Sequence, residues 1–441
     1  MRAEATPESQ NPYASVSQLG RVLVQVENNY VDPVERDKMV EGAIKGMVEN
    51  LDPHSAYLPP EDWRQFQSDT EGRFGGVGLE VDGRSDKLIV IAPIEGSPAE
   101  RAGIKSGDQI VAIDGEDVVG QGFEKIVKRM RGGPGTKVKI TMLREKKDRD
   151  QAAKDGGTHA GSTLTFELTR EIIHVAAVTQ KLLDGNVGYF RIKQFQERTH
   201  AELVAGIAKL RGEGKGEIAG VLLDLRSNPG GLVDEATEIA DELLTTGGIY
   251  SMRHRGRVIE DLKARGGGAL TDVPVVVLVN EYSASASELL VGALQDNHRA
   301  TVVGTNTFGK GSVQSVLPLP NGAGLKLTTA RYYTPSGHAI QADGIHPDVT
   351  IDPPQKPGSD EARILRERDL PGHLGAEGPQ GGSSRRDADA GAHVAASAKD
   401  EVLIGAAARE IPPDPSTTND TALRVGYQML RTQMAQQARR Q

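Results

Sequence analysis

Two short segments of the chain carry side chains that could act together as a nucleophile and a base. Residues 283–288 have the sequence Ser-Ala-Ser-Ala-Ser-Glu, and residues 308–312 have the sequence Phe-Gly-Lys-Gly-Ser. A serine hydroxyl is a poor nucleophile near neutral pH, and a lysine can take its proton once burial lowers the lysine pKa enough to leave the amine neutral. The pairing of one of these serines with Lys310 therefore predicts acyl-transfer chemistry that needs no histidine.

The serine run also fits the start of a helix. Apolar residues follow Glu288, and Ser283 or Ser285 could accept a hydrogen bond from an amide of the first turn. Capping and nucleophilicity are compatible, because free amides and the helix dipole stabilise negative charge that develops on an acyl oxygen. Taken alone, a glycine-flanked lysine indicates a solvated turn. Whether Lys310 is such a turn residue or a catalytic base therefore depends on the elements around it.

The elements that would position these segments alternate between strand and helix along residues 174–352. Apolar runs predict strands and periodic stretches predict helices, at 187–192, 199–211, 218–225, 233–244, 275–279, 285–295 and 301–303. This alternation predicts an α/β core with a largely parallel sheet, in which ligands bind at the carboxyl ends of the strands.

A glycine pair follows one of the predicted strands. Residues 224–231 have the sequence Asp-Leu-Arg-Ser-Asn-Pro-Gly-Gly, in which Gly230 and Gly231 allow close approach to a bound carbonyl and could donate half of an oxyanion hole. A plain turn before a helix is the alternative. We favour the oxyanion role because Ser285 also follows a strand, so both loops are expected to open on one edge of the sheet.

Residues 73–173 resemble a PDZ domain. Short apolar runs, a Gly-Asp turn, an Asp-Gly turn and a predicted helix at 123–130 occur in the order of that fold. The resemblance implies that Gly76, Val77, Gly78 and Leu79 form the loop whose amides hold a peptide carboxylate, beside a sheet edge that accepts the peptide as an added strand. The alternative for the two glycines is an ordinary tight turn.

Composition excludes several classes of protein. The chain has 441 residues, no cysteine and a formal net charge of −9, and it contains no apolar run long enough to span a bilayer. Disulfides, thiolate metal sites and a cysteine nucleophile are therefore excluded, and nucleic-acid binding is disfavoured. No histidine and carboxylate set has clear ligand spacing, so we expect neither a metal nor a cofactor.

Together, the PDZ pattern, the loop at 224–231, the serine run and the segment Phe-Gly-Lys-Gly-Ser-Val-Gln at 308–314 resemble a carboxyl-terminal processing protease. The resemblance covers roughly residues 13–353. It implies a PDZ-containing serine endopeptidase with a Ser-Lys dyad on a crotonase-like fold. The fold class implied is multidomain α+β and α/β: a helical N-terminal unit at 1–72, a PDZ domain at 73–173, a peptidase core at 174–353 and a linker with a helical tail at 354–441.

The resemblance also assigns roles to single residues. The middle serine of the run, Ser285, is the expected nucleophile, and Lys310, which follows Phe-Gly, is the expected base. Gln314 is expected to orient the lysine; in a helical turn it would lie one turn beyond Lys310, on the same face. The oxyanion donors would be the amides of Ala286 and of Gly230 or Gly231.

Further expectations concern regulation, partners and location. Arg131 matches an arginine that couples the PDZ position to the catalytic part, and its alternative is a surface turn arginine. The expected partners are a protein or peptide substrate with an exposed C-terminus, a second copy of the chain held through the N-terminal unit and the helical tail, and an activating adaptor protein. The resemblance implies the bacterial cell envelope, periplasmic or extracytoplasmic, with an export signal that this chain does not show.

Two other classes of function remain open. One is a non-catalytic PDZ scaffold that binds protein C-termini. The other is a different enzyme, either a crotonase-like acyl-CoA enzyme or a Ser-His-Asp hydrolase that uses His298, His338 or His346. These histidines stand singly in polar contexts, which favours surface or packing roles. An acyl-CoA enzyme has no evident use for a PDZ domain.

Overall fold

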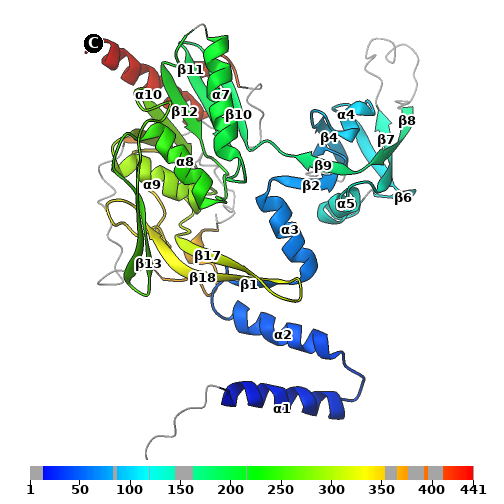
Figure 1. The fold of residues 1–441 in the computed structure, drawn as a ribbon. Coiled ribbons are helices and arrows are strands. Elements are labelled where there is room, and N and C mark those ends of the chain that lie inside the picture. The colour runs from blue at the N-terminus through cyan, green and yellow to red at the C-terminus, as the bar shows by residue number, and fades with distance from the viewer. Residues whose placement is uncertain are drawn as a thin grey trace, which may run out of the picture.

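The computed structural model describes residues 13–82, 87–118, 120–144, 162–214, 216–352, 365–375, 392–395 and 411–440. Figure 1 shows an N-terminal helical arm, a small β-rich domain and a larger core along the chain. Most of the predicted linker after residue 353 lies outside the described residues. Within the described ranges, no helix has the length and apolar character needed to cross a bilayer.

The core is built on a seven-stranded sheet of order β10-β11-β12-β15-β16-β19-β20. Its strands are β10 (Val178–Leu183), β11 (Val187–Ile192), β12 (Gly220–Asp224), β15 (Val275–Val279), β16 (Ala300–Gly304), β19 (Val349–Asp352) and β20 (Ala392–Ala395). The pair β10 and β11 is antiparallel, and the other neighbours are parallel. The predicted α/β core with a largely parallel sheet is therefore confirmed.

Helices cover both faces of this sheet. Along β12, Val221 and Leu223 pack in one apolar cluster with residues of three helices, whereas Leu222 packs in a second cluster with residues of one helix. The first three are α7 (Thr199–Glu213), α8 (Val233–Leu243) and α9 (Ala286–Asp296), and the fourth is α10 (Thr421–Ala438). Every second residue of a buried strand faces the same side, so each strand contributes to both layers.

The family resemblance predicts that the helical tail, which contains α10, contacts a second copy of the chain. In the structure its side chains Leu423, Tyr427 and Leu430 are at most 2% exposed and pack against the sheet of their own chain. Gly426 shows how close this packing is, because a Cβ there would lie 2.7 Å from a methyl group of Leu278. The helix therefore forms the second layer of the core.

A smaller antiparallel sheet lies beside the core helices (Figure 1). Its strands are β1 (Ala56–Leu58), β13 (Gly248–His254), β14 (Arg257–Lys263), β17 (Ser312–Pro318) and β18 (Gly324–Tyr333). Strand β18 pairs with β1, β13 and β17, so it joins the N-terminal unit to the segment that follows Lys310.

The small domain has the strand order β3-β4-β5-β7-β8, with the short β6 beside β5. Its elements are β3 (Leu79–Asp82), β4 (Leu88–Pro93), α4 (Pro98–Arg101), β5 (Gln109–Ile113), β6 (Glu116–Asp117), α5 (Phe123–Met130), β7 (Lys137–Arg144) and β8 (Ser162–Thr169). This arrangement agrees with the predicted PDZ domain. Two antiparallel strands, β2 (Arg73–Gly76) and β9 (Glu171–His174), carry the chain into and out of it.

Three helices precede the PDZ domain: α1 (Ala14–Asn29), α2 (Arg36–Glu49) and α3 (Pro60–Thr70). No side chain of α1 is buried in this chain, whereas α3 lies between the core and the PDZ domain (Figure 1). Proline at the first helical position of α3 supplies a fixed φ and lacks the amide that a helix start would leave unpaired.

Candidate active site

Ser285 lies at a sharp turn between β15 and α9. Its φ of 57° is in the left-handed region, which a side-chain-bearing residue adopts only where surrounding contacts hold it there. Ser283 and Ser287 are fully buried, and their hydroxyls donate to the carbonyls of Leu225 and Asn228 at 2.8 and 3.0 Å. Ser285 is half-buried and lines a cavity, so the middle serine is the one placed to meet a substrate.

The loop that carries the glycine pair touches the serine turn. A Cβ on Gly230 would lie 2.8 Å from both Ala284 O and Ser285 Cβ, and 3.0 Å from Ala286 N. The amide of Gly230 donates to Asn228 Oδ1 at 2.9 Å. Within the described residues, no hydrogen bond uses the amide of Gly231, which makes Gly231 the better-placed donor of the pair.

Lys310 lines the same cavity as Ser285, about 520 Å³ in volume. Burial, and after it the positive charge of Lys326, lower the pKa of its amine to about 8, against the opposing effect of Glu367, Glu288 and Asp52. About a tenth of the amine is then neutral at pH 7, against a few parts in ten thousand at its ordinary pKa of 10.5. A lysine in this state can accept a proton.

One buried carboxylate, Glu288, ties the serine turn to the lysine loop. Its Oε2 accepts from the amides of Ser285 at 2.7 Å and Lys310 at 2.9 Å. Its Oε1 accepts from the amide of Gly309 at 2.6 Å and from Thr307 Oγ1 at 2.5 Å. Burial raises the pKa of Glu288 to about 7, although these four hydrogen bonds favour the ionised form.

Glu288 ends the serine run, and the sequence alone did not assign it a role. Its spacing carried a signal that could have found it, because a glutamate three residues after an N-terminal serine is the pattern of a capping box. The structure extends that local pattern across to the lysine loop.

Lys310 does not lie in a helical turn, so Gln314 does not lie one turn beyond it on a shared helical face. Residues 312–318 pair with β18 as strand β17, and a register shift falls between Val313 and Gln314. Pairing across the ladder directs Gln314 Nε2 toward Ser312 Oγ at 2.9 Å and Thr328 Oγ1 at 3.3 Å. Gln314 still lines the cavity, and no hydrogen bond in the described part of the chain uses its Oε1.

The cavity is completed by residues that sequence analysis did not single out. Apolar side chains come from α3, from the loop before α7, from the start of α8 and from the antiparallel sheet: Trp63, Phe66, Phe195, Leu232, Val233, Val313 and Tyr332. Lys326, on β18, adds a second amine. In the described chain no hydrogen bond joins Ser285 Oγ to Lys310 Nζ, as is common in a catalytic site without substrate.

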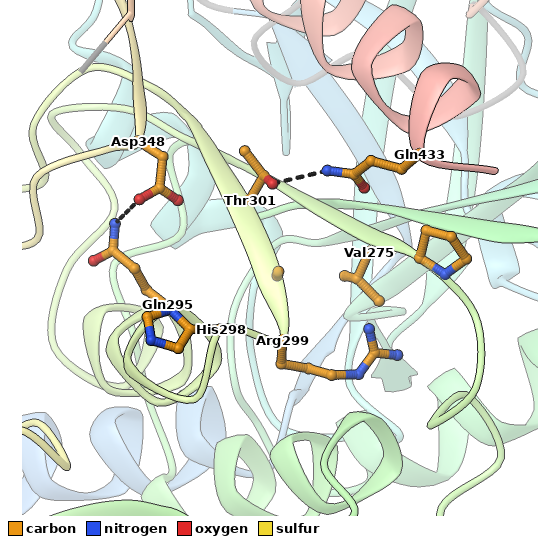
Figure 2. A pocket seen from close by; sticks show the side chains of 9 residues that line it. Val275, Gln295, His298, Arg299, Thr301, Asp348 and Gln433 are labelled. Carbon is orange, nitrogen blue, oxygen red and sulfur yellow. Dashed lines mark hydrogen bonds between the residues drawn. The ribbon is translucent and has the colours of Figure 1, made fainter. Parts of the chain in front are cut away.

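The three histidines considered for a Ser-His-Asp hydrolase lie away from this cavity. His298 lines a different one of about 350 Å³, together with Arg299, Asp348 and Gln433 (Figure 2). His338 Nε2 lies 3.0 Å from Gly344 O, and His346 Nε2 lies 3.2 Å from Asp343 Oδ1. None of the three lines the cavity of Ser285.

The predicted peptide-binding loop of the PDZ domain lies between β2 and β3. Gly78 has a φ of +77° and a Cβ there would lie 2.2 Å from Ser97 Cβ, so only glycine fits. In the described residues no hydrogen bond uses the amides of Val77 or Gly78, and β3, which begins at Leu79, pairs on one side only. Free amides beside an open strand edge suit an added peptide strand.

Arg131 connects the PDZ domain to α3. It follows α5 directly, its guanidinium lies 4.7 Å from the centroid of the Phe74 ring, and its Nη1 lies 3.7 Å from Asp69 Oδ1 near the end of α3. A second contact between the same helices joins Lys128 Nζ to Glu61 Oε1 at 2.7 Å. Since Trp63 and Phe66 of α3 line the cavity, the PDZ domain touches an element of its wall.

Comparisons with known families match three parts of the chain. Residues 186–351 match peptidase family S41, residues 89–144 match the PDZ domain, and residues 2–62 match the N-terminal domain of the activating protease CtpB. These matches agree with the predicted N-terminal unit, PDZ domain and peptidase core.

The chain is similar to a carboxy-terminal-processing protease of Bartonella bacilliformis, at 38% identity over 93% of each chain. It is also 36% identical to a probable CtpA-like serine protease of Staphylococcus epidermidis, over 78% of this chain and 66% of that relative. A solved photosystem II D1 C-terminal processing protease is 30% identical, with a TM-score of 0.44 over 76% of this chain and 86% of that one. The chain therefore belongs to the carboxy-terminal-processing proteases of peptidase family S41.

Proposed function

We propose that this protein is a serine endopeptidase that cleaves protein substrates near their C-termini, with Ser285 as nucleophile and Lys310 as general base. The observation that carries the proposal is the shared cavity, which brings the one accessible serine of the run together with a buried lysine whose pKa is about 8. Glu288 supports it by holding the backbone of both residues. A non-catalytic scaffold would have no need for a buried lysine whose pKa lies near neutral pH.

The reaction begins when neutral Lys310 takes the proton of Ser285 Oγ, which attacks the scissile carbonyl carbon. The carbonyl oxygen becomes an oxyanion, and the amides of Ala286 and Gly231 donate to it. Lys310 then gives its proton to the leaving amine, and the acyl-enzyme forms. A water molecule, deprotonated by the same lysine, hydrolyses the ester and restores Ser285.

Gln314 acts on the position of the lysine in this proposal. Its Oε1 is available to accept a hydrogen bond from the Lys310 amine, while its Nε2 is held by Ser312 and Thr328. An amide anchored at one end and free at the other can aim an amine without exchanging protons with it.

The PDZ loop Gly76 to Leu79 would hold the substrate carboxylate, and Arg131 would transmit the PDZ position to α3. Dimer contacts are assigned to α1, where Val16, Leu19 and Val22 are each more than half exposed. We also propose an extracytoplasmic location in the bacterial envelope and regulation by an activating adaptor. Both rest on the family resemblance.

Cleavage of an unfolded protein with an accessible C-terminus tests the dyad. Ser285→Ala and Lys310→Met should each abolish turnover, while Ser283→Ala, at a serine bonded to Leu225 O, should keep activity at temperatures where the variant is folded. A fluorophosphonate probe should label wild type at Ser285, as mapped by mass spectrometry, and label Lys310→Met far more slowly. Turnover by Ser285→Ala would refute the proposal.

A further inference from the structure

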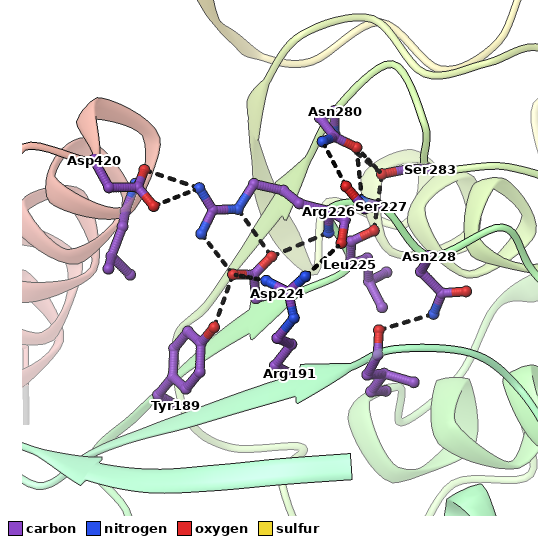
Figure 3. Close-up of polar contacts among 12 residues, drawn as sticks. Tyr189, Arg191, Asp224, Leu225, Arg226, Ser227, Asn228, Asn280, Ser283 and Asp420 are labelled. Carbon is purple, nitrogen blue, oxygen red and sulfur yellow. Dashed lines mark hydrogen bonds and ion pairs between the residues drawn. The ribbon is translucent and has the colours of Figure 1, made fainter. Parts of the chain in front are cut away.

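The first residue before α10 is bonded to the loop that carries the glycine pair. Asp420 Oδ1 and Oδ2 accept from Arg226 Nη1 at 2.8 and 2.7 Å, and Asp420 Oδ1 also caps the helix by accepting from Leu423 N at 3.0 Å (Figure 3). The other side of the guanidinium is held by Asp224, through Nε at 3.0 Å and Nη2 at 2.7 Å. Arg226 is therefore held between two carboxylates from distant parts of the chain.

This cluster is closed to solvent and its charges balance. Asp224, Arg226, Asp420 and Arg191 are between 0% and 5% exposed. Arg191 Nη1 lies 3.5 Å from Asp224 Oδ2, so two cations face two anions. Burial acts to lower the pKa of Arg226, but the two carboxylates outweigh it and raise the pKa well above its ordinary value. Removal of one charge would leave its partner buried and uncompensated.

Arg226 stands immediately before the residues that contact the serine turn. Ser227 has a φ of 58°, and its amide donates to Asn280 Oδ1 at 2.7 Å. The carbonyl of Asn228 accepts from Ala284 N and from Ser287 Oγ, each at 3.0 Å, so it is bonded on both sides of Ser285. Any shift of Arg226 along the loop would therefore move the contacts of the nucleophile and the glycine pair together.

We propose that Asp420 is a positioning residue for catalysis: through Arg226 it fixes the loop at 225–231, so that the Gly231 amide and the Ser285 turn keep the geometry needed for oxyanion stabilisation. The inference rests on the proposed function and adds to it a part played by the C-terminal helix. Asp420 touches neither substrate nor the reacting atoms, and its effect passes through the loop. The helix thus does more than cover the second face of the sheet.

The test compares two variants that weaken α10 in different ways. Asp420→Asn keeps an oxygen for the helix cap but removes the charge and one acceptor of Arg226. Leu430→Ala, at a fully buried position of α10 outside the ion cluster, weakens helix docking and leaves Arg226 paired. For both, kcat and KM are measured on the same protein substrate, below the thermal unfolding midpoint of each variant. Inhibition by a peptide boronate reports the oxyanion geometry.

Asp420→Asn should lower kcat by roughly 10-fold to 100-fold, as expected for a misplaced catalytic geometry, with KM changed less than twofold. Its boronate affinity should fall in parallel, and the pH midpoint of kcat/KM should stay in place because Lys310 is untouched. Leu430→Ala should keep kcat despite a lower thermal midpoint.

Two results would overturn the inference: wild-type kcat in Asp420→Asn, or an equal loss of kcat in Leu430→Ala. The Ser285→Ala variant, assayed in parallel, separates this failure from failure of the proposed function. Activity in Ser285→Ala would refute the dyad and the inference with it, whereas an inactive Ser285→Ala beside a fully active Asp420→Asn would refute the inference alone.

Discussion

Replacement of Lys326 by methionine should move the pH profile of the enzyme to higher pH. Lys310 and Lys326 line one cavity, and the charge of Lys326 is the second cause, after burial, of the lowered pKa of Lys310. From 10.5 to about 8, the lowering of the Lys310 pKa amounts to about 3 kcal/mol. Methionine is unbranched and only one atom shorter than lysine, so it keeps most of the desolvation of Lys310 but removes the charge.

Because Lys326 acts less strongly than burial, its removal should raise the pKa of Lys310 by about 0.5 to 1 pH unit. In the proposed mechanism the base is the neutral amine of Lys310, so activity should rise with pH through this pKa, and the rise should move to higher pH by the same amount. At pH 7, kcat/KM should then fall about threefold to tenfold, with recovery near pH 9.5.

The assay is kcat/KM from pH 6 to 10 on an unfolded protein substrate, which reports pKa values of the free enzyme. Lys326→Arg keeps the charge and should keep the midpoint. Lys137→Met, which removes a surface lysine paired with Glu167 in the PDZ domain, controls for net charge. This prediction would be refuted if the pH midpoint of Lys326→Met lay within about 0.2 pH units of the wild-type midpoint, or below it. The charge of Lys326 would then not lower the pKa of Lys310.

Two further predictions address the glycine loop and the PDZ connection. Gly230→Ala should lower kcat on the order of 100-fold, because the new Cβ would lie 2.8 Å from Ser285 Cβ, whereas Gly212→Ala, which meets open space on α7, should leave kcat unchanged. Arg131→Ala removes a partly exposed ion pair and a cation–π contact, together worth about 1–2 kcal/mol. The stimulation of cleavage by a peptide that binds the PDZ domain should therefore fall by up to about tenfold, and equal stimulation in both proteins would contradict a coupling role.

Much of the core could be predicted from sequence because its signals are local. The runs at 187–192 and 275–279 are apolar throughout, as strands buried on both faces are, and the stretches between them have helical periodicity. Parallel pairing of β12 with β15 then brings the loops after them to one edge. Gly230 and Ser285 both lie in these loops.

The contacts that complete the site lack such local signals. Asp420 and Arg226 are 194 residues apart. A single aspartate before a helix indicates a helix cap, and no local sequence pattern predicts that it also pairs with an arginine. The spacing of four between Lys310 and Gln314 is compatible with a helical turn, but strand pairing with β18 determines the direction of Gln314. The position of α3 over the cavity depends on packing between domains, which no periodicity in its own sequence reveals.

The single carboxylate of Glu288 has a consequence for how the enzyme can be controlled. Because it accepts hydrogen bonds from the backbone amides of both Ser285 and Lys310, displacement of either residue alone would break one of these bonds. If the loop of Ser285 or the loop of Lys310 moved away alone, the buried Glu288 carboxylate would lose hydrogen bonds. Each lost bond would cost about 1–3 kcal/mol. This cost favours movement of the two residues of the proposed dyad together. An activator would then change the fraction of working molecules, while the turnover of each working molecule stays constant.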